Sequence, residues 1–90
     1  MEFTGFGNTG LTVSRLGMGL AEIGRGSLTP EEESKISRVL NLALDSGINF
    51  LDTAGCYGSS EELIGRTIPH RRHEVFLATK CGHVARRVFR

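Results

Sequence analysis

The sequence predicts an α/β fold in which short β-strands alternate with α-helices and the strands run parallel. Three apolar segments begin near residues 16, 49 and 75, about 33 and 26 residues apart, close to the roughly 30 residues of a strand–helix–strand unit. Between them lie two segments that open with Thr or Ser three residues before Glu, the pattern of a helix N-terminus. This alternation is typical of sheets and barrels whose strands are joined by helices.

The composition is that of a globular chain of near-neutral charge. The 90 residues carry 11 basic and 10 acidic side chains, a net charge of +1, so neither nucleic acid nor an anionic membrane is an expected partner. The sequence lacks the basic start and apolar run of a signal peptide, and no stretch approaches about 18 apolar residues, which predicts a cytoplasmic location. Cys56 and Cys81 are expected to be free thiols, and the 12 glycines need local structural reasons.

The first element is predicted to be a β-hairpin over residues 3–15. Residues 8–10, Asn-Thr-Gly, form a typical turn sequence between two short strand-like stretches. Glycines at positions 5, 7 and 10 also have the spacing of a dinucleotide-binding loop. That loop follows a buried strand and opens a helix, and neither is predicted here, so the hairpin is the preferred interpretation.

The first strand of the main sheet is predicted at 16–20, followed by a helix over 30–46. In the strand, apolar residues alternate with glycines, which let backbone or ligand approach closely. The helix begins at a capping box formed by Thr29 and Glu32 and ends at Gly47, a typical residue for a helix C-terminus. The residues expected on its apolar face are Ile36, Val39, Leu40 and Ala43.

The second and third units repeat this arrangement. The ranges predicted are a strand at 48–53, a helix at 60–67, a strand at 74–80 and a loop tail at 81–90. Ser59 and Glu62 are predicted to form a second capping box at the start of the helix. The third strand is apolar from Val75 to Ala78, as expected in a parallel sheet.

Polar residues at the ends of the second and third strands form the candidate site. Asp52 and Lys80 are expected to pair if these strands are parallel neighbours, because the carboxyl ends of such strands meet at one edge of the sheet. Tyr57 follows Asp52 by five residues, and a phenol becomes a useful proton donor when a nearby cation stabilises its phenolate. Alternatively, Asp52 caps a turn, Tyr57 packs at the rim and Lys80 is solvated.

Three segments of the chain resemble motifs of the aldo-keto reductases. Residues 47–65, Gly-Ile-Asn-Phe-Leu-Asp-Thr-Ala-Gly-Cys-Tyr-Gly-Ser-Ser-Glu-Glu-Leu-Ile-Gly, resemble the signature of that family. Ala78-Thr79-Lys80 resembles its lysine motif, and residues 10–19 are similar to its hairpin and first barrel strand. The resemblance extends to about residue 82 and is nearest to the branch that interconverts an aldose or similar carbonyl compound with its oxidised or reduced partner.

The resemblance implies the N-terminal portion of a (β/α)8 TIM barrel, with the hairpin closing the barrel bottom and the chain truncated after the third barrel strand. It also implies NADPH or NADH as cofactor and hydride transfer to or from a carbonyl or sugar substrate. Tyr57 would be the proton donor, Lys80 its cationic partner and Asp52 the carboxylate holding Lys80. The residues implied in cofactor binding are Gly19, Leu20, Ala21, Asp52 and Tyr57.

The family's catalytic histidine lies at the end of the fourth barrel strand, beyond Arg90, so the 90-residue chain alone is expected to be an inactive fragment. One alternative is a non-catalytic remnant or interaction module that keeps the first barrel units. Another is a barrel enzyme in which Lys80 forms a Schiff base with a carbonyl substrate. No metal site is predicted, and the sequence leaves the substrate, the choice of cofactor and the oligomeric state open.

Overall fold

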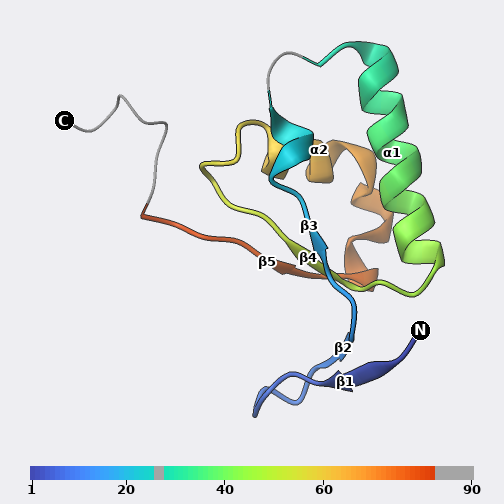
Figure 1. Cartoon of the computed structure of the whole chain (residues 1–90), viewed down its shortest axis with the longest axis vertical. Coiled ribbons are helices and arrows are strands. Elements are labelled where there is room, and N and C mark those ends of the chain that lie inside the picture. Colours follow the sequence, from blue (N-terminus) through green and yellow to red (C-terminus); the bar gives the residue numbers. More distant parts are fainter. Residues whose placement is uncertain (26–27, 83–90) are drawn as a thin grey trace.

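The computed structural model describes residues 1–25 and 28–82, arranged as a small parallel sheet with its helices on one side and a separate hairpin at one end (Figure 1). The sheet has the order β3-β4-β5, and both pairs of neighbouring strands are parallel. The elements are β1 (Phe3–Gly5), β2 (Thr12–Ser14), β3 (Met18–Gly19), the 3-10 helix η1 (Glu22–Gly24), α1 (Pro30–Asp45), β4 (Phe50–Asp52), α2 (Ser60–Thr67), the 3-10 helix η2 (Pro69–Glu74) and β5 (Phe76–Ala78). From residue 83 onward, the predicted loop tail lies outside the described residues.

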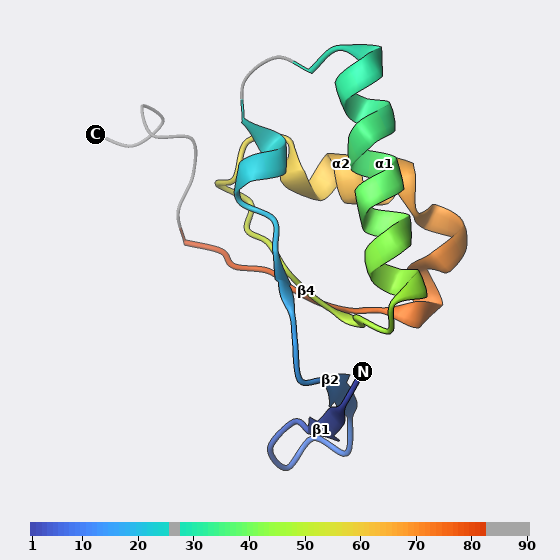
Figure 2. The same cartoon turned by 45° about the vertical axis from the view of Figure 1, so that its right-hand side comes forward.

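The hairpin of β1 and β2 is attached to the amino end of β4. The Asn49 side chain accepts a hydrogen bond from the Ser14 amide at 2.7 Å and donates one to the Thr12 carbonyl at 3.2 Å. The rings of Phe6 and Phe50 lie 5.5 Å apart. The hairpin therefore sits at the end of the sheet opposite to the carboxyl ends of the strands (Figure 2).

Helix α1 has the N-terminus that the sequence predicts. The Thr29 hydroxyl accepts a hydrogen bond from the Glu32 amide at 3.1 Å, and the Glu32 carboxylate accepts one from the Thr29 amide at 3.0 Å. At the other end, Gly47 has a φ of +99° and its amide donates to the Leu44 carbonyl at 3.0 Å. That left-handed conformation closes the last turn of the helix and favours glycine.

The expected apolar face of α1 is wrong at Val39. Leu40 and Ala43 are buried, as is Leu44, whereas Val39 is 49% exposed. At about 100° per residue, Val39 lies roughly 60° from Ile36 on the side away from Leu44, so it falls at the edge of the apolar face. The hydrophobic core draws on both helices and all three parallel strands or their flanking residues, and its buried members are Leu20, Leu40, Leu44, Leu51, Ile64, Ile68 and Val75.

The regular strands are shorter than the segments predicted for them. Paired strands of two, three and three residues lie within the segments predicted as strands at 16–20, 48–53 and 74–80. The third segment was expected to begin at Glu74, but this residue ends η2. Its carboxylate binds Arg71, and β5 begins only at Phe76.

The second predicted capping box is absent. At the N-terminus of α2, the side chain of Ser59 makes no capping hydrogen bond. The backbone of Ser59 has φ −96° and ψ 17°, not the extended conformation that Thr29 adopts at φ −81° and ψ 160°. The start of α2 is fixed instead by the buried side chain of Ser60, whose hydroxyl lies 2.7 Å from that of Thr53.

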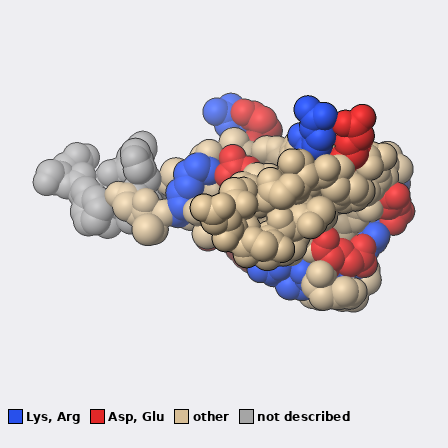
Figure 3. All heavy atoms as spheres, turned by 90° about the horizontal axis from the view of Figure 1, so that it is seen from below, with Lys and Arg blue, Asp and Glu red and all other residues tan. Residues whose placement is uncertain are grey.

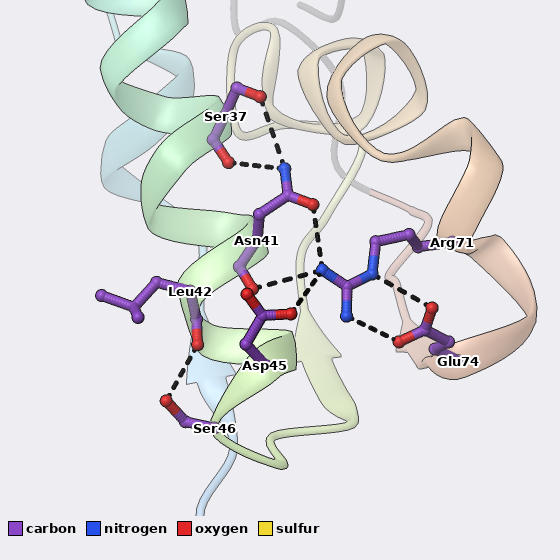
Figure 4. Close-up of polar contacts among 7 residues, drawn as sticks. All are labelled: Ser37, Asn41, Leu42, Asp45, Ser46, Arg71 and Glu74. Atoms are coloured by element: carbon purple, nitrogen blue, oxygen red, sulfur yellow. Dashed lines mark hydrogen bonds and ion pairs between the residues drawn. The ribbon is translucent and has the colours of Figure 1, made fainter.

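A cluster around Arg71 joins η2 to the last turns of α1 (Figure 4). The guanidinium contacts the Asn41 side chain at 3.0 Å and the Asp45 carboxylate at 2.9 Å, and donates two hydrogen bonds to Glu74. The bidentate bond from Arg71 lowers the pKa of Glu74 below its ordinary value. These contacts hold the segment that leads into β5 against the helix.

Charged side chains of both signs are interspersed on the face that carries the hairpin end, where Lys and Arg groups lie beside Asp and Glu groups (Figure 3). This distribution agrees with the net charge of +1. Within residues 1–25 and 28–82, neither helix is long and apolar enough to cross a membrane.

Candidate functional site

The carboxyl ends of the three parallel strands bring the candidate residues to one edge of the sheet. Gly19 pairs with Asp52, and Asp52 pairs with Ala78. The Leu20 amide donates a hydrogen bond to the Asp52 carbonyl at 2.9 Å, which fixes the end of β3 against β4. Lys80 lies two residues after Ala78, so its backbone is at the same edge of the sheet.

The Lys80 side chain folds back over the end of β4. Its ammonium donates hydrogen bonds to the Asp52 carboxylate at 2.7 Å and to the Thr53 carbonyl at 2.9 Å. The same Nζ lies 5.0 Å from the centre of the Tyr57 ring, within the range of a cation–π contact. Three groups from residues 52–57 therefore surround one cation that is more than 20 residues away in sequence.

The charge state of Lys80 follows from these neighbours. Its hydrogen bond to Asp52 raises the pKa of Lys80 above the ordinary value, partial desolvation opposes this, and Tyr57 acts in the same direction as Asp52. The side chains of Lys80 and Asp52 are 50% and 49% exposed. The ammonium is therefore charged at neutral pH and still open to a ligand.

The loop that carries Tyr57 is held by a close backbone contact with η1. The Ser59 amide donates to the Gly24 carbonyl at 3.1 Å. A Cβ built on Gly24 would lie 2.2 Å from the Tyr57 carbonyl oxygen, and one on Gly58 would lie 2.0 Å from the Gly24 carbonyl oxygen. A side chain at either position would overlap backbone atoms, so the two glycines allow the Tyr57 loop to pack directly against η1 above the strand ends.

A family model described as the aldo/keto reductase family matches residues 15–89, which include this whole edge of the sheet. The chain belongs to the aldo/keto reductase family. The match agrees with the resemblance of the three motifs, and the solved relative below confirms that the described residues form the N-terminal portion of a (β/α)8 barrel.

Three relatives illustrate the similarity. The aldo-keto reductase YhdN of Bacillus subtilis is 39% identical over 86 residues, covering 91% of this chain and 26% of that protein. The 6-dehydroglucose reductase of Novosphingobium aromaticivorans is 35% identical over 91 residues, covering 89% of this chain and 29% of that protein. The structure of aldo-keto reductase AKR11C1 from Bacillus halodurans, in its holo form, superposes with a TM-score of 0.77 and 37% identity, covering 91% of this chain and 26% of that one. The chain thus spans about a quarter of the length of these aldo/keto reductases.

Aldo/keto reductases use NADPH or NADH, and the end of β3 fits such a cofactor. Gly19 is exposed, and a Cβ built there would meet no heavy atom within 4 Å. This open backbone lies beside Asp52, its pairing partner on β4. Leu20, by contrast, has a fully buried side chain, so only its backbone faces the site, while Ala21 is half-buried.

Several residues that shape the site carried no local signal. The Thr53 amide donates a hydrogen bond to the Ala78 carbonyl, and the Thr53 carbonyl accepts one from Lys80. The Thr53 hydroxyl shares a hydrogen bond with that of Ser60. Gly24 lies between the strand predicted at 16–20 and the helix predicted at 30–46, in a segment for which no element was predicted. Both act through contacts with distant segments, and only the excess of glycine hinted at close backbone packing.

Proposed function

We propose that the barrel to which these residues belong is an NAD(P)H-dependent oxidoreductase that interconverts a carbonyl compound, such as an aldehyde, ketone or sugar, with its alcohol. The observation that carries this proposal is the Lys80 ammonium, which contacts the Asp52 carboxylate at 2.7 Å and lies 5.0 Å from the Tyr57 ring centre. The name of the 6-dehydroglucose reductase supports a sugar carbonyl as one substrate class.

In the reducing direction, the Tyr57 hydroxyl donates its proton to the carbonyl oxygen as the carbonyl carbon gains a hydride. The nicotinamide cofactor, when bound, supplies that hydride and accepts one in the reverse direction. The Lys80 ammonium stabilises the phenolate left on Tyr57, and Asp52 keeps Lys80 charged and directed at the ring. Solvent then returns a proton to the phenolate. We assign cofactor contacts to Gly19, the backbone of Leu20, Ala21, Asp52 and Tyr57.

The proposal is tested with the protein expressed from its complete reading frame. NADPH and NADH oxidation is followed with 4-nitrobenzaldehyde as the carbonyl probe. Tyr57→Phe should lower kcat about a hundred- to ten-thousand-fold, the usual contribution of a positioned proton donor. Cys56→Ser is the control, because Cys56 lies exposed on the same loop and makes no part of the proposed machinery.

Full activity of Tyr57→Phe would refute the assignment of the proton donor. Absence of both turnover and NADPH binding in the wild-type protein would favour the non-catalytic module instead. A covalent adduct on Lys80 after borohydride treatment in the presence of the aldehyde would favour Schiff-base chemistry.

A further inference from the structure

We propose that Glu61 and Thr79 form a positioning pair that directs Lys80 into the site, an inference that rests on the proposed function. The Thr79 hydroxyl donates a hydrogen bond to the Glu61 carboxylate. Glu61 lies in the first turn of α2, and Thr79 immediately precedes Lys80. This contact joins the helix to the segment carrying the catalytic cation, and the reaction itself makes no use of it.

The direction of Lys80 depends on how the backbone leaves β5. Successive side chains of an extended strand point to opposite faces, so anchoring Thr79 to α2 turns Lys80 away from the helix. On that other face, Lys80 meets Asp52 and the Thr53 carbonyl. The side-chain bond of Thr79 therefore selects the face on which the ammonium acts.

Apart from the side-chain bonds of Thr79 and Lys80, the segment after β5 is held by few backbone bonds within the described residues. The Thr53 amide donates to the carbonyl of Ala78, the last residue of β5, and beyond that strand the Gly55 amide donates to the Lys80 carbonyl at a long 3.3 Å. The other carboxylate oxygen of Glu61, Oε1, faces Gly55 and lies 3.8 Å from the position of a Cβ built there. The carboxylate thus sits between the Tyr57 loop and the residue before Lys80.

A purely structural role for Glu61 predicts a different pattern of effects. An acidic side chain in the first turn of a helix is favourable to that helix wherever it points. Glu62 provides the matched comparison, because it lies in the same turn and pairs with Arg66 at 2.6 Å instead of with Thr79. Loss of Glu62 removes a first-turn charge and leaves the segment before Lys80 untouched.

The test uses the complete protein with NADPH and 4-nitrobenzaldehyde, and it measures kcat and KM separately. Thr79→Val and Glu61→Ala should lower kcat about ten- to a hundredfold with little change in KM, as expected for a misplaced catalytic group. Thr79→Ser keeps the hydroxyl, and Glu61→Gln keeps an acceptor oxygen, so both should retain most of the activity. Glu62→Ala should match the wild type.

The deciding measurement repeats Thr79→Val in a Lys80→Met background. If Thr79 acts through Lys80, adding Thr79→Val should not lower the residual kcat of the Lys80→Met protein any further. The proposal would be overturned if Thr79→Val lowered kcat by the same factor in both backgrounds, or if Thr79→Val alone kept the wild-type kcat. It would also be overturned if Glu62→Ala lowered kcat as much as Glu61→Ala does. Failure of the proposed function would show separately, as an unaltered kcat in Tyr57→Phe or no turnover in the wild type.

Discussion

The buried pair of Thr53 and Ser60 offers a quantitative test of how the strand end is attached to α2. Their hydroxyl oxygens lie 2.7 Å apart, and both residues are fully buried. Thr53→Val preserves the shape of the side chain and leaves the Ser60 hydroxyl without its partner. A buried polar group that loses its hydrogen bond costs about 1–3 kcal/mol of folding free energy, so this single substitution should destabilise by that amount.

Ser60→Ala should cost a similar amount, because it leaves the Thr53 hydroxyl unpaired. The double variant removes both polar groups, and such paired removal is nearly neutral. We expect its free energy of unfolding to lie within about 1 kcal/mol of the wild type, although simple addition of the two single losses gives about 2–6 kcal/mol. The non-additivity, measured as a double-mutant cycle, is the signature of the hydrogen bond.

Urea denaturation of the complete protein, followed by circular dichroism, provides these free energies for all four proteins. Ser46→Ala serves as the control, because its hydroxyl makes an exposed bond to the Leu42 carbonyl and should change stability by less than about 0.5 kcal/mol (Figure 4). Additive losses in the double variant, or a Thr53→Val protein as stable as the wild type, would refute the reasoning.

Two further predictions concern the helix ends and the Arg71 cluster. Thr29→Ala should cost about 0.5–2 kcal/mol of unfolding free energy in urea, and Ser59→Ala clearly less, because only Thr29 caps its helix; equal losses would contradict this. Arg71 lowers the pKa of Glu74, so the stabilising effect of that carboxylate is present above the ordinary value of about 4.3 and is lost as the pH falls through the lowered one. The difference in stability between wild type and Glu74→Gln should therefore shrink between neutral pH and pH values below about 4, and a constant difference would argue against the ion pair.

Sequence patterns predicted those features whose cause lies within a few residues. The capping box of Thr29 is a local exchange of hydrogen bonds, and it forms as predicted. The proximity of Asp52 and Lys80 follows from one further rule, that parallel strands end at the same edge, and the two side chains do meet. Their catalytic roles stay a prediction for the assays above.

The features that were missed depend on partners far away in the chain. Ser59 has the same sequence context as Thr29, yet its backbone is held by the Gly24 carbonyl in a conformation that cannot cap. Val39 satisfies the helical period but falls outside the surface covered by the core. A local pattern contains no information on which segment will pack against it, so these outcomes required the tertiary structure.

The contact between η1 and the Tyr57 loop shows why the candidate site cannot be separated from the packing of the first barrel units. Gly24 contributes no side chain, yet its carbonyl accepts from Ser59 and its Cα lies against the Tyr57 carbonyl so closely that a methyl group would overlap it. Lys80 is held on the other side by Asp52 and the Thr53 carbonyl. The distance between the phenol and the ammonium therefore depends on a backbone contact on the tyrosine side and on Asp52 and the Thr53 carbonyl on the lysine side. A change at Gly24 alters the site without touching a functional group.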